Sequence, residues 1–141
     1  MTRIDFHSNV SDRIAYACRL TRKARAAECR IVLLASGSDQ LATLDDALWK
    51  FSEFDFLPHV AAQDRLAART PIVLADSDAI DLPHHQILIN LSGKPPANFA
   101  RFERLFEIIS TDDADKLAAR ERYVFYKQRG YQLTHYDAEN A

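Results

Sequence analysis

The residues best suited to chemistry in this sequence lie near its end. Lys116, Arg120, Tyr123 and Lys127 recur at spacings i, i+4, i+7 and i+11, which places them along one narrow stripe of an α-helix. Such a stripe can hold an anion, because a guanidinium grips a carboxylate or phosphate with two hydrogen bonds and Arg and Tyr are common binding hot spots. We therefore predict a site for an acidic peptide, a carboxylate or a nucleic-acid backbone. The alternative is an ordinary solvated helix face.

The helix that carries this stripe is expected from about Asp112 to Arg129. Aspartates crowd its start, where the helix macrodipole favours anions, and Gly130 stands where a left-handed C-terminal cap would fall. Arg122 and Arg129 are expected along the flank of the stripe. The core face is expected to consist of the apolar residues on the other side, Leu117, Ala118, Val124 and Phe125.

Motifs for enzyme chemistry are weak. The chain has only three glycines, and no phosphate-binding loop or dinucleotide fingerprint can be written from them. The five histidines are scattered, without the spacing that places two metal ligands on one face. We therefore expect no metal, no cofactor and no catalytic residue.

Two isolated features leave an enzyme as an alternative. Asp76, Asp78 and Asp81 follow an expected strand, where α/β enzymes often place functional carboxylates. Either of the first two could be the acid of a small α/β hydrolase, although a solvated loop is the simpler interpretation. Cys18 has no evident histidine partner in the sequence, so a nucleophilic role is not expected.

Large aromatic side chains cluster in the middle of the chain. Trp49, Phe51, Phe54 and Phe56 fall within eight residues of one another. They could form a core cluster, or they could form an apolar surface patch for a partner protein.

Composition indicates a soluble protein of one domain, residues 1–141. The formal net charge of -2 argues against a wholly basic nucleic-acid-binding domain but leaves room for a local basic patch. The two cysteines are too few for a disulfide framework. Asp5 stands where a signal peptide would be apolar, and no apolar run approaches the roughly 20 residues that cross a membrane. We expect a cytoplasmic location.

Strand and helix patterns alternate along the chain. Continuous apolar runs of strand length, such as 30–35, 71–75 and 86–91, are typical of strands buried on both faces. We predict a three-layer α/β fold with a mostly parallel central sheet. Further strands are expected at 3–7 and 107–109, a short extended piece at 56–59, and helices at about 12–28, 39–50 and 99–106.

Several segments together resemble the chi subunit family of bacterial DNA polymerase III holoenzyme. They are Leu44-Asp45-Asp46-Ala47-Leu48-Trp49, Phe56-Leu57-Pro58-His59, Ile87-Leu88-Ile89-Asn90-Leu91 and Ala119-Arg120-Glu121-Arg122-Tyr123, followed by Tyr126 and Gly130. Their order and spacing run through most of the chain. The resemblance implies a nucleotide-binding-like α/β fold without a phosphate loop, in a non-catalytic accessory subunit of the replicative polymerase.

The resemblance also implies partners. Chi-family proteins pair with the psi subunit, which tethers them to the clamp loader, and bind the acidic C-terminal tail of single-stranded-DNA-binding protein. They reach single-stranded DNA indirectly. The family's tail-binding positions match Ile109, Lys116, Arg120 and Tyr123. Val124 replaces a further lysine of some relatives, so Lys127 is expected to take over that contact.

The family's psi-binding positions match Trp49 and Phe56, and an accessory helicase can use the same surface. The remaining alternative is a module that binds single-stranded nucleic acid directly through the stripe at residues 116–127.

Overall fold

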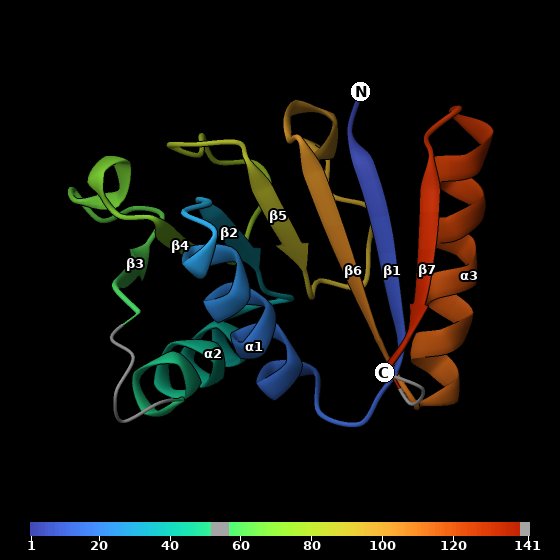
Figure 1. The fold of residues 1–141 in the computed structure, drawn as a ribbon, viewed down its shortest axis with the longest axis horizontal. Coiled ribbons are helices and arrows are strands. Elements are labelled where there is room, and N and C mark those ends of the chain that lie inside the picture. Colours follow the sequence, from blue (N-terminus) through green and yellow to red (C-terminus); the bar gives the residue numbers. More distant parts are fainter. Residues whose placement is uncertain (52–56, 139–141) are drawn as a thin grey trace.

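The computed structural model describes residues 1–51 and 57–138. Its seven strands form one sheet in the order β3-β4-β2-β5-β6-β1-β7, and every strand pair is parallel (Figure 1). The strands are β1 (Arg3–Val10), β2 (Ile31–Leu34), β3 (His59–Ala61), β4 (Ile72–Ala75), β5 (Ile87–Asn90), β6 (Arg104–Ser110) and β7 (Leu133–Asp137). The helices are α1 (Arg13–Ala26), α2 (Ser38–Lys50) and α3 (Asp113–Gln128), with short 3-10 turns η1 (Ala67–Arg69) and η2 (Phe99–Arg101).

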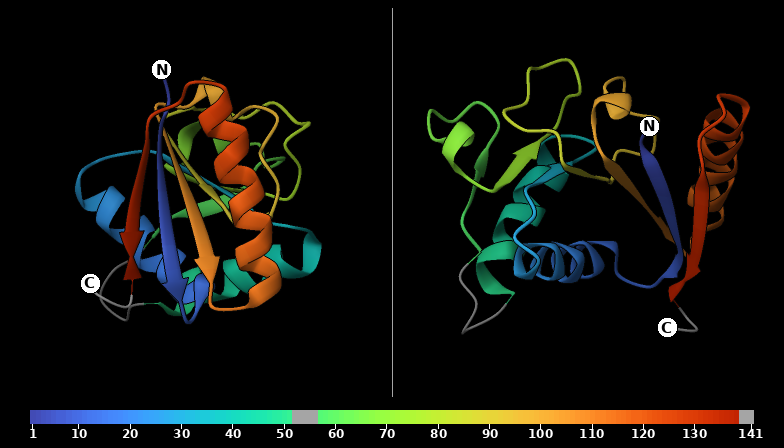
Figure 2. Two further views of the ribbon diagram at one scale, coloured as in Figure 1. Left: turned by 90° about the vertical axis from the view of Figure 1, so that its right-hand side faces the viewer. Right: turned by 45° about the horizontal axis from the view of Figure 1, so that its top comes forward.

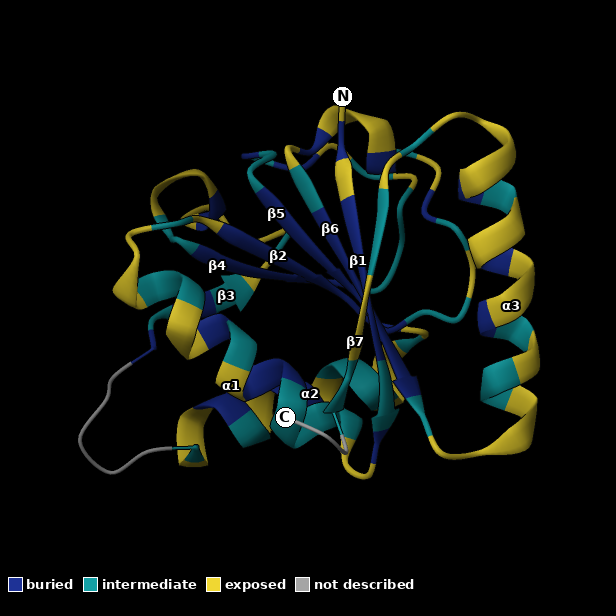
Figure 3. Cartoon of the chain, turned by 45° about the vertical axis from the view of Figure 1, so that its right-hand side comes forward, coloured by how far each residue is buried: buried dark blue, intermediate teal, exposed yellow. Residues whose placement is uncertain are grey.

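Helices cover both faces of the sheet. α1 and α2 pack on one face and α3 packs on the other (Figures 1 and 2). Strands β2, β4 and β5 are buried along their whole length, as expected for strands whose residues are all apolar except Asn90, and Figure 3 shows them within the buried centre. The predicted three-layer α/β fold is therefore confirmed.

Local signals set the ends of the helices. The Asp12 side chain caps α1 by accepting a hydrogen bond from the Ala15 N–H at 3.0 Å, and Asp112 caps α3 by accepting one from the Asp115 N–H at 3.2 Å. Gly130 follows α3 with a φ of 84°, a conformation that glycine adopts without steric cost. No helix in the described part of the chain is long and apolar enough to cross a membrane.

Two elements differ from the sequence prediction. The helix expected at 99–106 is wrong, because only the turn η2 forms there and β6 already begins at Arg104. This strand lies between β5 and β1, so half of its backbone pairing is with β1 at the start of the chain, which no local pattern signals. Strand β7 was not predicted at all, because it is a sheet edge with a partly exposed, polar sequence.

The predicted core face of α3 is correct for Phe125, which packs against the core, but wrong for two of its other residues. Leu117 and Val124 are 58% and 50% exposed, whereas the buried residues of the helix are Ala119, Arg122 and Tyr126. The helical wheel failed because it assigned Arg122 to the polar flank. An arginine can lie in a core when a buried carboxylate pairs with it.

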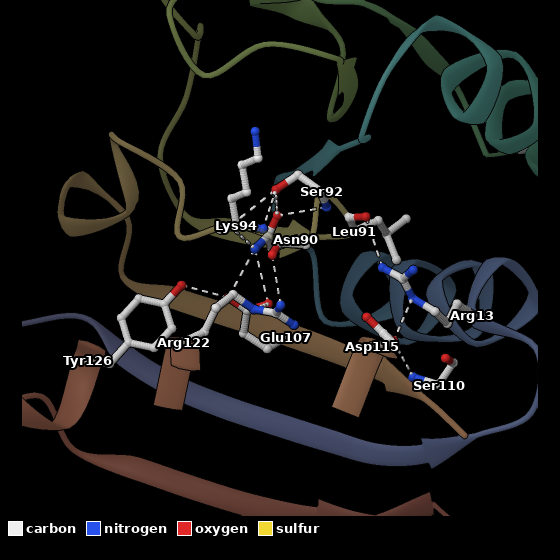
Figure 4. Close-up of polar contacts among 11 residues, drawn as sticks. Arg13, Asn90, Leu91, Ser92, Lys94, Glu107, Ser110, Asp115, Arg122 and Tyr126 are labelled. Carbon is white, nitrogen blue, oxygen red and sulfur yellow. Dashed lines mark hydrogen bonds and ion pairs between the residues drawn. The ribbon is translucent and has the colours of Figure 1, made fainter. Parts of the chain in front are cut away.

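That carboxylate is Glu107, in the middle of β6. Arg122 Nε donates to Glu107 Oε1 at 3.1 Å, Tyr126 Oη–H donates to Oε2 at 2.6 Å, and Asn90 Nδ2 lies 3.0 Å from both oxygens (Figure 4). Arg122 Nη1 also donates to the Gly93 carbonyl at 3.0 Å. Burial raises the pKa of Glu107, and the Arg122 charge and these donors oppose that effect.

The start of α3 is fixed by a second set of polar contacts. The Asp115 carboxylate accepts from the Ser110 N–H at 2.7 Å and lies 4.0 Å from Arg13 Nε (Figure 4). Arg13 in turn donates to the Leu91 carbonyl at 2.9 Å. These contacts connect α3 to α1 and to the end of β5.

We predict that Arg122→Ala lowers the free energy of unfolding by about 3–5 kcal/mol, because it leaves the Glu107 carboxylate buried and unpaired. Urea unfolding measures the change. Arg120→Ala, which removes an exposed arginine from the same helix, is the matched control and should change stability by about 0.5 kcal/mol or less. An Arg122→Ala protein as stable as this control would contradict the role given to the pair.

Candidate functional site

The candidate site is a cavity of about 430 Å³ between α3 and the strands beneath it. It brings together Ile109 from the end of β6 with Lys116, Arg120 and Tyr123 from α3, four of the residues singled out in the sequence. The whole lining is Phe6, Ser8, Asn9, Ile109, Lys116, Ala119, Arg120, Tyr123 and His135. α3 packs against β6 and β7, and Figure 2 shows it beside this end of the sheet.

The floor of this cavity is apolar. Phe6, Ile109 and Ala119 are all buried, and the Tyr123 ring meets the Phe6 ring edge-on with centroids 5.4 Å apart. Tyr123 remains 36% exposed, so it forms a wall and not part of the core. An apolar floor of this kind suits a hydrophobic or aromatic side chain.

The rim of the cavity is cationic. Lys116 is half-buried and Arg120 is exposed, and no described carboxylate lies within 4.0 Å of either charged group. Two of the three aspartates at the start of α3 have other hydrogen-bond partners, since Asp112 caps α3 and Asp115 accepts from the Ser110 N–H. The positive charge of the rim is therefore available to an anion.

Lys127 stands beside the cavity and does not line it. Its ammonium lies 5.7 Å from the centre of the Tyr123 ring, within the range of a cation–π interaction. Val124 does not line the cavity either. The solvent-facing position predicted for the stripe is correct, and its role in binding stays a prediction.

Apart from Ile109, the strand residues that line the cavity were not predicted from the sequence. Ser8 Oγ and His135 Nε2 lie 2.6 Å apart, and Asn9, with a φ of 57°, donates to Asp137 Oδ1 at 3.0 Å. These residues come together because β1 and β7 pair in parallel, with Ser8 opposite Asp137. No local pattern signals a contact between positions about 130 apart.

The second predicted surface lies at the end of α2, on the other face of the sheet. Trp49 is 54% exposed, which excludes the core-cluster interpretation for this residue. Its ring contacts His59, with centroids 4.5 Å apart, and His59 Nε2 lies 3.1 Å from Asp45 Oδ1. Phe56, like Phe54, lies outside the described residues.

The candidate enzyme residues lie apart from the cavity on α3. Asp78 accepts a hydrogen bond from the Ala97 N–H at 2.6 Å, and neither Asp76 nor Asp78 lines the cavity on α3. Within residues 1–51 and 57–138, no group of three His, Cys, Asp or Glu side chains could hold a metal ion. Cys18 is buried, and burial, with a smaller effect of Asp12, raises the pKa of its thiol to about 11.

Comparison with known proteins agrees with the resemblance found in the sequence. A family profile described as "DNA polymerase III chi subunit, HolC" matches residues 1–134. The chain belongs to this family. Family membership makes it an accessory subunit of DNA polymerase III and confirms the predicted role in DNA replication.

Three proteins named DNA polymerase III subunit chi illustrate the similarity. The protein from Pseudomonas aeruginosa is 32% identical over 137 residues, which cover 94% of each chain. The protein from Haemophilus influenzae is 26% identical over 118 residues, 84% of this chain and 82% of the relative. The protein from Escherichia coli is 25% identical over 116 residues, which cover 82% of this chain and 79% of the relative.

We predict that Cys18 resists alkylation. With a thiol pKa of about 11, roughly one molecule in a thousand carries the reactive thiolate at pH 8. Iodoacetamide labelling followed by peptide mass spectrometry should modify the half-buried Cys29 first, and both cysteines at similar rates in urea. Labelling of Cys18 as fast as Cys29 in the folded protein would contradict this prediction.

Proposed function

We propose that this chain is a non-catalytic adaptor that links the clamp loader of DNA polymerase III, through psi, to the C-terminal tail of single-stranded-DNA-binding protein. The observation that carries the proposal is the cavity on α3, where an apolar floor lies beneath a rim of uncompensated positive charge. Few ligands match both features. An apolar residue at the C-terminus of a chain matches both, because its side chain fits the floor and its terminal carboxylate fits the rim.

The tail implied by the family resemblance has this chemistry, since it ends in an aromatic residue preceded by aspartates. In the proposed complex, Arg120 binds the terminal carboxylate with two parallel hydrogen bonds. The aromatic ring enters the cavity over Ile109 and Phe6. Lys116 and Lys127 attract the preceding aspartates.

The exposed charges of the rim also determine how strong and how salt-dependent the proposed contact is. Exposed ion pairs are individually weak and are screened by salt, so a single tail binds with modest, salt-sensitive affinity. A DNA strand coated with single-stranded-DNA-binding protein presents many tails. Repeated capture then raises the overall affinity without any new contact.

We propose the surface around Trp49 as the site for psi or for an accessory helicase, the partners to which the family resemblance assigns both Trp49 and Phe56. Support comes from the exposure of Trp49 and its location on α2, across the sheet from α3 (Figure 1). The two partners therefore approach opposite faces and do not compete for space. We expect the adaptor to work in the cytoplasm, without polymerase, nuclease or ATPase activity of its own.

We predict that Arg120→Ala weakens tail-peptide binding by about 2 kcal/mol, or roughly thirtyfold, because it removes the bidentate contact. Arg120→Lys should recover only part of the affinity, since an ammonium lacks the planar fork. Lys127→Ala should cost less, as a rim charge in water contributes little. Fluorescence anisotropy with a labelled peptide at physiological salt measures all three. Wild-type affinity in Arg120→Ala would show that this site is wrongly assigned.

A separate prediction concerns Trp49. Trp49→Ala should abolish co-purification with psi, because truncating a large aromatic at the centre of an interface typically costs about 2 kcal/mol or more. Its unfolding midpoint and its affinity for the tail peptide should stay unchanged, as the side chain is mostly outside the core. Arg69→Ala, an exposed substitution elsewhere on the surface, is the control. Undiminished psi binding by Trp49→Ala would refute the assignment.

A further inference from the structure

A second cavity lies on the opposite face of the sheet from the tail-binding cavity, and the adaptor function leaves it unused. It measures about 410 Å³ and lies between α1 and strands β1, β6 and β7, a size typical of small-ligand sites. In Figure 1, α1 and α2 cover the left part of this face and leave β1 and β7 open. Tyr136, which belongs to the lining, is exposed, so the cavity opens to solvent there.

Aromatic rings form one wall of this cavity. His7 and Tyr136 stack with centroids 5.1 Å apart and planes 22° apart, and Phe106 meets His7 edge-on at 5.6 Å. Tyr136 is 46% exposed, so part of its ring area remains open. Such a wall suits a planar ring, because aromatic side chains stack on any nucleobase whatever its sequence.

The helix beside this wall is strongly basic. The α1 sequence RIAYACRLTRKARA holds five cations and no acid. Lys23 lines the cavity and, within the described part of the chain, has no carboxylate within 4.0 Å. The Arg19 guanidinium lies 5.4 Å from the centre of the Tyr16 ring, which also lines the cavity. Positive charge thus borders the aromatic wall.

The two carboxylates that line the cavity already have partners. Asp5 Oδ2 accepts from Arg104 Nη2 at 2.6 Å, and Asp137 Oδ1 accepts from Asn9 Nδ2 at 3.0 Å. Three further polar atoms in this lining are buried and have no hydrogen-bond partner among the described residues: Asp5 Oδ1, His7 Nε2 and Arg104 Nε. Buried polar groups are usually satisfied, so these atoms leave bonding capacity for a ligand.

We propose that this cavity and the adjoining face of α1 bind a nucleotide unit of single-stranded DNA. The base stacks on the wall formed by His7 and Tyr136, and Lys23 and Arg19 hold the adjacent phosphates. An interface of cations and aromatic rings is the usual composition of a surface for single strands. The adaptor would then touch the strand itself on one face while it holds the protein tail on the other.

Fluorescence anisotropy of the full chain with a labelled 20-nucleotide deoxythymidine strand tests the proposal. Binding at 50 mM salt should weaken about tenfold at 200 mM, as expected for two or three neutralised phosphates. Tyr136→Ala and Lys23→Ala should each weaken binding about fivefold or more. Arg69→Ala, which removes an exposed cation at η1, should not. Thymidine monophosphate should displace the strand at high concentration.

The outcomes separate this site from the tail site. Loss of strand binding in Lys23→Ala, with unchanged affinity for the tail peptide, supports the proposal. No binding at 50 mM salt overturns it, and so does binding that Arg120→Ala abolishes but Lys23→Ala leaves intact, because the strand would then lie on α3. If strand binding is unchanged in Tyr136→Ala and is not reduced by thymidine monophosphate, the placement of a base in the cavity is wrong.

Discussion

The ion pair between Glu107 and Arg122 determines how α3 lies on the sheet. Both side chains are almost fully buried, and Tyr126 and Asn90 complete the hydrogen bonds of the carboxylate. A charge in the core tolerates little displacement, because moving either partner exposes the other to a large desolvation cost. The pair therefore fixes the rotation of the helix. With Arg122 pointing into the core, Arg120 lies about 200° away around the helix axis and faces solvent at the rim of the cavity.

The contrast between neighbouring arginines explains what the sequence could and could not reveal. The buried strands and the turn at Gly130 follow from local patterns, and each was predicted correctly. The core face of α3 was not, because Arg122 and Arg120 look alike in a helical pattern. Only the buried Glu107, 15 positions earlier, distinguishes them. A lone glutamate inside an otherwise apolar strand was the available signal.

Pairing between strands distant in sequence explains the other features that were not predicted. Strand β7 has little apolar character of its own and becomes a strand because β1 offers it a parallel edge. The cavity on α3 needs Phe6 and Ser8 from one end of the chain and His135 from the other, so sequence spacing predicts only its α3 side. Local sequence patterns likewise do not tell which helices lie on which face of the sheet. This arrangement separates the surface around Trp49 from the cavity on α3, as an adaptor with two simultaneous partners requires.

The central claim is that the cavity on α3 recognises an apolar terminal residue together with its carboxylate. Calorimetric titration with the acidic tail peptide, with and without its terminal phenylalanine, tests this most directly. Burial of a phenylalanine side chain contributes about 1.5–3 kcal/mol, so removing that residue should weaken binding about tenfold or more, although the aspartates and a new terminal carboxylate remain. Equal affinity of the two peptides would mean that the surface responds to negative charge alone, and would contradict the account.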